Sequence, residues 1–383
     1  MNSTRQMFPR VKPIYPVYRL DEETFRIGAQ LGITAEFEDS NGQLWTLVHL
    51  LDGSRNLQQV CEEMRSQYPD LSDHDIKDGI STLDQEGFIE NASVHSDTES
   101  AQVNERYVGN VNYFSHYAGL SDNREDYQRV LEGSKVALFG LGGAGSNILA
   151  VLAATGIGQI VAVDYDRVER TNLNRQYLYR EADIGSLKTE AASEIMATIN
   201  SDLAFSTVTQ KITSASEAFE IIQGMDLVIC AIDEPPFLAQ RIVNRASVRA
   251  GVPCVFAAMQ VTRARVFSVV PKESGCFDCL NIHYALNDPQ FTQQFQGFHQ
   301  TNFDPPTIAF APNIIQLCGA VAAEAVLTGY QSPITAGTQF ELDFEAGTGH
   351  PLLSWPRYPE KCPTCGTGKE EDWVVFSYYP GSL

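Results

Sequence analysis

The sequence predicts an α/β protein with a Rossmann-like, doubly wound, mostly parallel sheet and a four-cysteine zinc site, plus a small N-terminal α+β domain of winged-helix type. Three observations support this. Strands alternate with helices after residue 134, a glycine-rich run joins the first of these strands to a helix, and short strands precede three helical patterns in residues 11–92. A polar run, residues 91–104, separates the two parts, so the predicted domains are 1–95 and 96–383.

Turn residues and helix caps define the elements of the N-terminal domain. A polar turn separates two strands, and Ser72 has the position of a helix N-cap. The predicted strands are Val17–Leu20, Phe25–Gly28 and Ala35–Glu38, and the predicted helices cover 44–51, begin at Asn56 and begin at Ser72.

The second domain opens on a short apolar strand, Lys135–Phe139, and continues with alternating elements. The expected helices are Gly145–Thr155 and Lys188–Ile199, and the expected further strands are Gln159–Asp164 and Leu227–Ile232. Strands alternating with helices imply a parallel sheet with helices on both faces.

Composition excludes several classes of partner. The formal net charge of −21 argues against nucleic acid, which needs clustered Lys and Arg. No apolar run approaches a membrane span, and the N-terminus lacks the apolar core of a secretory signal, so we expect a cytoplasmic protein without a membrane partner.

The glycine-rich run follows the first strand and opens a helix. Glycines let backbone approach phosphates closely, and the helix N-terminus offers free N–H groups. Gly140, Gly142, Gly143 and Gly145 are therefore candidate phosphate-binding residues, and Asp164, at the end of the next strand, is a candidate for the ribose hydroxyls. A tight structural turn is the alternative.

A polar loop after Asp164 suits triphosphate better than a dinucleotide. Arg175 can fork onto phosphate oxygens and neighbouring amides can orient them. Lys188 begins a helix, where a cation gains nothing from the helix dipole, so a phosphate clamp is expected and a solvated lysine is the alternative. The further nucleotide-binding candidates in this loop are Asp166, Asn174 and Gln176.

Two more groups suit metal ions. Asp233 follows a buried strand and supplies a hard oxygen for Mg²⁺, although it could instead cap a helix. Two CxxC pairs in a reducing compartment indicate a closed structural zinc site rather than disulfides. Its ligands are Cys276, Cys279, Cys362 and Cys365.

Taken together, the GLGGAGS run, the NLNRQ run and the split CxxC pairs resemble the ThiF/MoeB adenylating family of the ubiquitin-activating superfamily, over roughly residues 105–366. The resemblance implies that the four glycines line the phosphates, that Asp164 holds the ribose, and that Arg175 and Lys188 grip the triphosphate while Asp233 positions Mg²⁺. It also implies catalytic roles for Arg175, Lys188 and Asp233, and a homodimer.

Residues 47–55 and 87–89 resemble PqqD-like domains, which bind leader peptides of ribosomally made precursors by strand addition. A small dimerisation or packing domain is the alternative. Fused to a ThiF-like enzyme, such a domain resembles the enzymes that mature the peptide antibiotics pantocin and microcin.

Two features depart from the family. Arg106 is followed by Tyr-Val-Gly, so the second arginine of an Arg-Tyr-x-Arg run is missing, and Arg106 or Arg124 could replace it. Cys318 lies in an apolar helical run, so no thioester step is expected. The loop Asn281–Pro312 is expected to cover the substrate, where His283 and His299 could assist.

The expected reaction is therefore ATP- and Mg²⁺-dependent adenylation of a carboxylate in a precursor peptide, namely a glutamate side chain, followed by dehydrative cyclisation. C-terminal adenylation of a peptide and activation of a ubiquitin-like sulfur carrier are the alternatives within the family. An NAD-dependent oxidoreductase would leave the polar loop, Lys188 and the zinc site unused, and intact Arg175, Lys188 and Asp233 argue against a non-catalytic scaffold.

Overall fold

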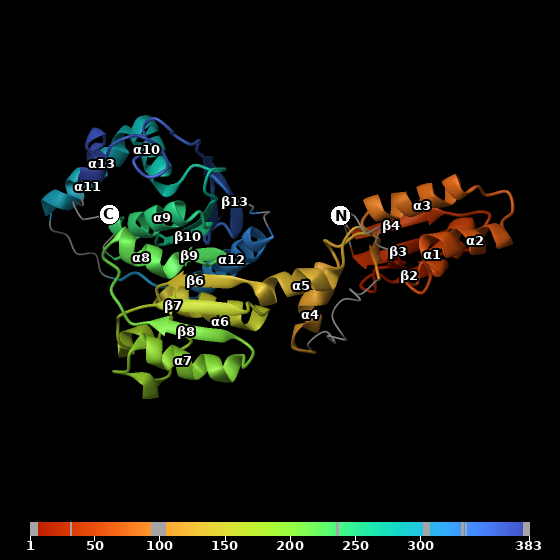
Figure 1. Ribbon diagram of the computed structural model, residues 1–383, viewed down its shortest axis with the longest axis horizontal. Helices are drawn as coiled ribbons and strands as arrows, with labels where there is room; N and C mark the ends of the chain where they lie inside the picture. The colour runs from red at the N-terminus through yellow and green to blue at the C-terminus, as the bar shows by residue number, and fades with distance from the viewer. Residues whose placement is uncertain are drawn as a thin grey trace. The chain divides into compact units, whose positions relative to one another are not determined.

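The computed structural model describes residues 7–30, 33–92, 105–234, 237–301, 307–330, 333 and 335–377. It divides into two compact units, Met1–Arg129 and Val130–Leu383. Each unit is described on its own below (Figure 1).

The N-terminal unit contains the three strands and three helices that its sequence predicts. Asn56 and Ser72 each accept a hydrogen bond from the N3 backbone N–H of the helix that they precede, as expected of N-caps. Strands β2 to β4 form an antiparallel sheet in that order, and β1 pairs with β5. The elements are β1 (Pro9–Val11), β2 (Val17–Arg19), β3 (Thr24–Gln30), β4 (Ile33–Glu38), α1 (Gln43–Leu50), α2 (Leu57–Gln67), α3 (Asp73–Gln85) and β5 (Ile89–Asn91).

A buried carboxylate joins the following helices to this unit. Glu90, in β5, is fully buried and accepts hydrogen bonds from Ser115 Oγ at 2.8 Å and Arg10 Nε at 2.8 Å, with Arg124 Nε 3.7 Å away. Ser115 is the C-cap of helix α4 (Val108–Phe114), and Arg124 is the first residue of helix α5 (Arg124–Gly133). These contacts help to explain why the compact unit extends to Arg129, past the linker at which the sequence divides the chain. Residues 93–104 of that linker lie outside the described ones.

The larger unit is built on one eight-stranded sheet with the order β13-β12-β11-β10-β9-β6-β7-β8. The strands from β10 to β8 run parallel, and β11 to β13 extend the sheet antiparallel. Its strands are β6 (Lys135–Phe139), β7 (Gln159–Val163), β8 (Ala204–Val208), β9 (Leu227–Cys230), β10 (Cys254–Met259), β11 (Arg263–Val269), β12 (Thr338–Asp343) and β13 (Thr348–Ser354). The predicted Rossmann-like, mostly parallel sheet is confirmed.

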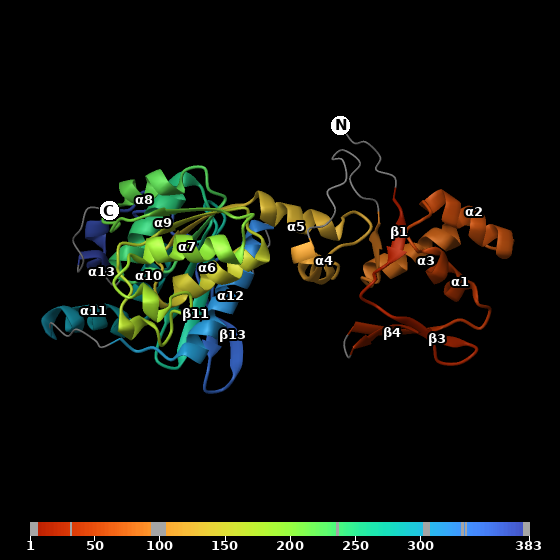
Figure 2. The same ribbon diagram turned by 90° about the horizontal axis from the view of Figure 1, so that it is seen from below.

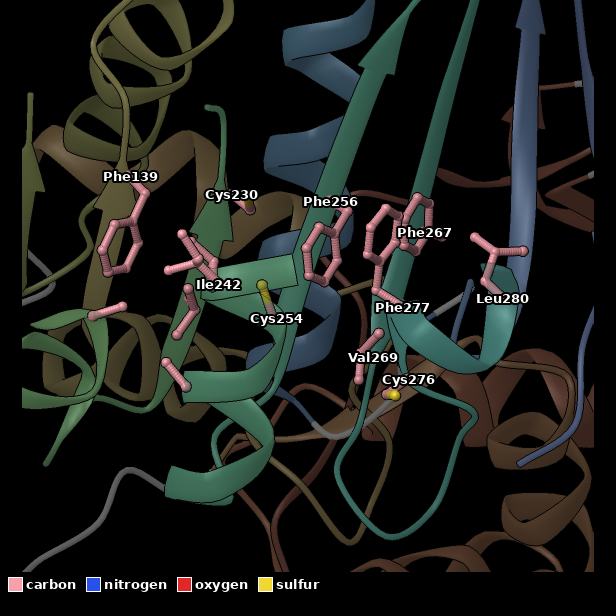
Figure 3. Close-up of a cluster of buried hydrophobic side chains, with 14 of the residues drawn as sticks. Phe139, Cys230, Ile242, Cys254, Phe256, Phe267, Val269, Cys276, Phe277 and Leu280 are labelled. Carbon is pink, nitrogen blue, oxygen red and sulfur yellow. The ribbon is translucent and has the colours of Figure 1, made fainter. Parts of the chain in front are cut away.

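Helices cover both faces of this sheet (Figures 1 and 2). One face carries α6, α7 and α12, and the other carries α8, α9 and α10. Figure 3 shows the core on the second face, where rings such as Phe256, Phe267 and Phe277 stack beside Ile242 of α9. The helices are α6 (Gly143–Thr155), α7 (Lys188–Ile199), α8 (Ala215–Ile222), α9 (Leu238–Ala250), α10 (Phe277–Asn287), α11 (Pro289–Thr301), α12 (Ala311–Gly329) and α13 (Val374–Ser377).

Two parts of the chain differ from what composition suggests. The expected covering loop, Asn281–Pro312, is largely helical in α10 and α11, and Pro289 occupies the first position of α11, where a missing N–H costs nothing. Helix α12 alone among the described helices is long and apolar enough to span a membrane. It packs against α6, β10 and β11.

Candidate functional site

A cavity of about 620 Å³ lies at the carboxyl ends of parallel strands in the larger unit, where doubly wound sheets bind ligands. Most of the predicted nucleotide-binding residues line it. These are Gly140, Gly142, Gly143, Asp164, Asp166, Arg175, Gln176, Lys188 and Asp233. Gly145 and Asn174 do not line the cavity. Gly145 lies in the first turn of α6, and Asn174 directly precedes Arg175 and accepts a hydrogen bond from it.

The glycine loop has its backbone path fixed by two close approaches. Gly140 has φ 99°, and a Cβ there would lie 2.6 Å from the Ala231 carbonyl oxygen. A Cβ on Gly145 would lie 1.9 Å from the Gly140 carbonyl oxygen. Gly145 therefore allows the loop to fold back onto α6 rather than facing the cavity. Gly142 is the N-cap of α6, so the first N–H groups of that helix are available to an anion.

Asp164 is held in place by two backbone hydrogen bonds. Its Oδ2 accepts from the Leu141 N–H at 2.7 Å and its Oδ1 from the Asp166 N–H at 2.8 Å. Tyr179 supports the same loop by donating its hydroxyl to the Leu141 carbonyl at 2.9 Å, and burial raises the pKa of this phenol far above its usual range. The acid at the end of β7 is thus fixed beside the glycine loop.

The two predicted phosphate cations already have partners. Lys188 Nζ lies 2.9 Å from Asp166 Oδ2, and only 5% of Lys188 is exposed. Arg175 Nη1 donates to the Thr171 carbonyl at 2.9 Å and to Asn174 Oδ1 at 3.0 Å. Asn174 therefore acts on the orientation of Arg175 from outside the cavity.

The loop that carries Arg175 is fixed to the glycine loop. Asn147 of α6 donates to the carbonyls of Gly143 and Arg175 at 2.7 and 2.8 Å. Gln176 is buried, and its Oε1 has no hydrogen-bond donor among the described residues. Asp233, just beyond β9, has an exposed carboxylate on the cavity wall. An exposed hard oxygen beside an anion-binding loop fits a Mg²⁺ ligand.

The sequence analysis missed several residues of the cavity wall. Tyr165 follows Asp164 directly, and Lys211 follows β8, with its Nζ 5.3 Å from the centre of the Tyr165 ring. The only sequence signal that places Lys211 in the cavity is its position shortly after a parallel strand, since ligands bind at the carboxyl ends of such strands. An apolar wall comes from the end of β10 and from the segment before α12. It comprises Ala257, Ala258, Met259, Ile308 and Ala309.

The four predicted zinc ligands lie together at the hydrophobic core that contains Phe256, Phe267 and Phe277. Their sulfurs all lie within 4.8 Å of one another, with Cys276–Cys362 at 3.5 Å and Cys279–Cys365 at 3.3 Å. Four thiolates at ~2.3 Å from one tetrahedral ion would be ~3.8 Å apart, so the spacing fits a zinc site with four cysteine ligands.

A buried charge network surrounds this cluster. Asp278, between the first two cysteines, pairs with Arg241 of α9, with Nε–Oδ1 at 2.9 Å and Nη2–Oδ2 at 3.1 Å. Thr364, between the second two, donates to Asp278 Oδ2 at 2.7 Å. Both cysteine pairs are therefore connected to α9 through one carboxylate.

Other candidate residues lie elsewhere. Cys318 is buried in α12 with its Sγ 3.4 Å from the Ala144 carbonyl, and burial raises its pKa to about 12, which disfavours the reactive thiolate. His283 Nδ1 lies 2.9 Å from the Tyr358 hydroxyl, beside the cysteine cluster. Arg124 lies beside Glu90 in the N-terminal unit. The His299 side chain is outside the described residues.

Comparison with known proteins gives matches in sequence and in fold. The SAMP-activating enzyme E1 of Haloferax volcanii is 30% identical over 167 residues, 44% of this chain and 60% of that enzyme. The sulfur carrier protein adenylyltransferase of Thermus thermophilus is 36% identical over 244 residues, 62% of this chain and 84% of that protein. The chain thus spans only part of the Haloferax relative.

Crystal structures with the same fold include two that cover most of this chain. Escherichia coli MccB with AMPCPP and MccA has a TM-score of 0.72 and 22% identity, covering 94% of this chain and 99% of that one. PaaA has a TM-score of 0.66 and 21% identity, covering 89% and 98%. The sequence pattern of the ThiF family matches residues 113–365, which hold the glycine loop, the cavity acids and both cysteine pairs, and the chain belongs to that family.

Proposed function

We propose that this protein uses ATP and Mg²⁺ to adenylate a carboxylate of a ribosomally made precursor peptide. The observation that carries the proposal is the cavity, where Arg175, Lys188, Asp164 and Asp233 surround a glycine loop at a helix N-terminus. ThiF-family adenylyltransferases are ATP-dependent adenylating enzymes, and the glycine loop, two cations and two acids that suit triphosphate chemistry line one cavity here.

The first step of this reaction requires that the protein compensate the negative charge of the triphosphate, and it requires no general acid or base. A carboxylate is already ionised at pH 7, so its oxygen can attack the α-phosphorus directly. The bond between the α- and β-phosphates breaks, and pyrophosphate leaves with the electron pair. Arg175 and Lys188 would stabilise the negative charge on the triphosphate as this bond breaks. Asp233 would hold Mg²⁺, which supplies further positive charge to the phosphates.

The acyl adenylate then reacts within the peptide. An amide or carbon nucleophile of the same peptide attacks the activated carbonyl and AMP leaves with one of the two original carboxylate oxygens. The peptide loses one water in total. We propose a glutamate side chain as the activated group, and the sequence resemblance to the pantocin type supports this choice.

The extent of the fold match favours a peptide over a sulfur carrier. The likeness to MccB, which has been solved with MccA, covers 94% of this chain and so includes the N-terminal unit. The sulfur carrier adenylyltransferase of Thermus matches only 62% of it. We propose that the N-terminal unit binds the leader of the precursor peptide, that the enzyme is a homodimer, and that it works in the cytosol, where its thiols stay reduced.

Sulfur-carrier activation is the second candidate. The 36% identity to the Thermus enzyme favours it, since that enzyme acts on a sulfur carrier protein by its name. Under this alternative the cavity would work on a C-terminal carboxylate of a small protein, and the N-terminal unit would have another role.

The deciding experiment uses a precursor peptide encoded near this gene, with all its carboxylates labelled with ¹⁸O, together with ATP and Mg²⁺. We expect pyrophosphate release, loss of one or more waters from the peptide, and one labelled oxygen in AMP for each water lost. A peptide that gains AMP would support the microcin-type reaction instead. No change in the peptide, with adenylation of a sulfur carrier ending in Gly-Gly, would overturn the peptide proposal. Asp233→Asn is the control that should lower pyrophosphate release by about 10²–10³-fold in every case.

A further inference from the structure

Tyr179 is a buried residue that contacts the glycine loop from outside the cavity. It follows Arg175 in the polar loop, is 4% exposed, and does not line the cavity. Its hydroxyl donates a hydrogen bond to the Leu141 carbonyl at 2.9 Å. Leu141 is itself fully buried, and its N–H donates to Asp164 Oδ2 at 2.7 Å. Side chains from two other parts of the chain therefore hold both backbone polar groups of this one residue.

The peptide unit that joins Leu141 to Gly142 has its orientation fixed by this hydrogen bond. In a planar trans peptide the carbonyl and the N–H point in opposite directions. The Leu141 carbonyl points to Tyr179 in the interior, so the Gly142 N–H points the other way, and Gly142 lines the cavity. Among the described residues, no acceptor is recorded for this N–H. It belongs to the N-cap of α6 and joins the first N–H groups of that helix as a donor to an anion.

Glycine at position 142 would also permit the inverted orientation of this peptide. Inversion changes ψ of the residue before the peptide and φ of the residue after it. Gly142 has φ −76°, and without a Cβ it could equally adopt a positive φ. The inverted peptide would direct the Leu141 carbonyl oxygen into the cavity, where it would repel a phosphate. The hydrogen bond opposes this inversion, because inversion would leave the buried Tyr179 hydroxyl without its recorded acceptor.

We propose that Tyr179 is a positioning residue for phosphate binding, which acts through the Leu141 carbonyl to keep the Gly142 N–H directed into the cavity. This inference rests on the proposed ATP-dependent function and adds a group that lies outside the cavity wall. A phenylalanine ring would fill the same buried space, so the hydroxyl alone carries the role. The Leu141 N–H belongs to the preceding peptide, so its contact with Asp164 is independent of the hydroxyl. The expected signature is weaker binding of phosphates with unchanged binding of a nucleoside.

Ligand binding to the full-length protein tests this role without any turnover. ATP and inorganic tripolyphosphate, each with Mg²⁺, are measured by calorimetry, and adenosine by ligand-observed NMR. For Tyr179→Phe we expect the affinities for ATP and tripolyphosphate to fall by a factor of about ten, equal to ~1.4 kcal/mol, and the affinity for adenosine to stay unchanged. Tyr68→Phe is the matched control, because the Tyr68 hydroxyl also donates to a backbone carbonyl, that of Gly42 at 3.0 Å, but in the N-terminal unit. This control should bind all three ligands like the parent protein.

The outcomes separate a positioning role from a structural one. A Tyr179→Phe protein that has a lower Tm but binds ATP like the parent, or that loses ATP and adenosine binding equally, overturns the positioning role and leaves the proposed function standing. Replacement of Tyr179 by 4-aminophenylalanine keeps the ring and restores a donor, so we expect it to recover most of the affinity for both phosphate ligands. A loss as large as that of Tyr179→Phe would count against the role. A parent protein that binds neither ATP nor tripolyphosphate overturns the proposed function itself.

Discussion

The buried pair of Arg241 and Asp278 allows a quantitative prediction. Both side chains are fully buried, and the guanidinium also contacts Glu370 Oε1 at 3.0 Å and lies 4.0 Å from the Phe376 ring centre. Arg241→Met keeps the apolar bulk but leaves the Asp278 carboxylate with only the Thr364 hydroxyl as its recorded side-chain donor. Removing one partner of a buried pair costs about 3–5 kcal/mol.

We expect that loss in the unfolding free energy of the larger unit, with a fall in Tm of ~6–20 °C for a domain of this size. Tryptophan fluorescence in a Trp45→Phe background reports this unit alone, because the remaining tryptophans, Trp355 and Trp373, both lie in it. The double variant Arg241→Met/Asp278→Leu removes both charges and should be more stable than Arg241→Met. A loss below about 1 kcal/mol for the single variant, or additive losses in the double, would refute the reasoning.

Three further outcomes test other parts of the molecule. Asp233→Asn should lower ATP–pyrophosphate exchange by about 10²–10³-fold with unchanged thermal stability, and activity within a few-fold of the parent would contradict its metal-binding role. Gly145→Ala places a Cβ 1.9 Å from the Gly140 carbonyl, so ATP binding measured by calorimetry should be lost; normal affinity would refute the fixed loop path. Cys279→Ser should remove bound zinc, measured by elemental analysis, and lower the Tm by more than Cys61→Ser in the N-terminal unit.

Local sequence predicted the elements on which the site is built. The strand Lys135–Phe139 and the helix Lys188–Ile199 have the predicted bounds, and the helix caps Asn56 and Ser72 act as expected. In each case the signal lies within a few residues of the feature, because turn glycines, caps and short apolar runs act through neighbouring backbone.

Features made by distant residues were not predictable in the same way. Glu90 meets Arg10, 80 positions earlier, and Ser115, 25 positions later, so no local pattern shows that helices α4 and α5 belong with the N-terminal unit. Lys211 enters the cavity only because β8 pairs with β7. The prediction of a loop over 281–312 is wrong for most of its length, because the Gln and Phe residues show no clear helical periodicity, although Pro289 marks the start of a helix.

The ion pair between Lys188 and Asp166 has a consequence for how the cavity receives its ligand. A lysine that is 5% exposed and held at 2.9 Å is already ordered, so an incoming anion need not restrict a flexible chain. The anion must instead displace Asp166, a resident counterion supplied by the protein itself. Exchange of one carboxylate for another anion leaves the ammonium neutralised throughout. Asp166 stays on the cavity wall after this exchange, so the negative charge that the anion brings must be balanced by another positive group of the cavity, such as Arg175.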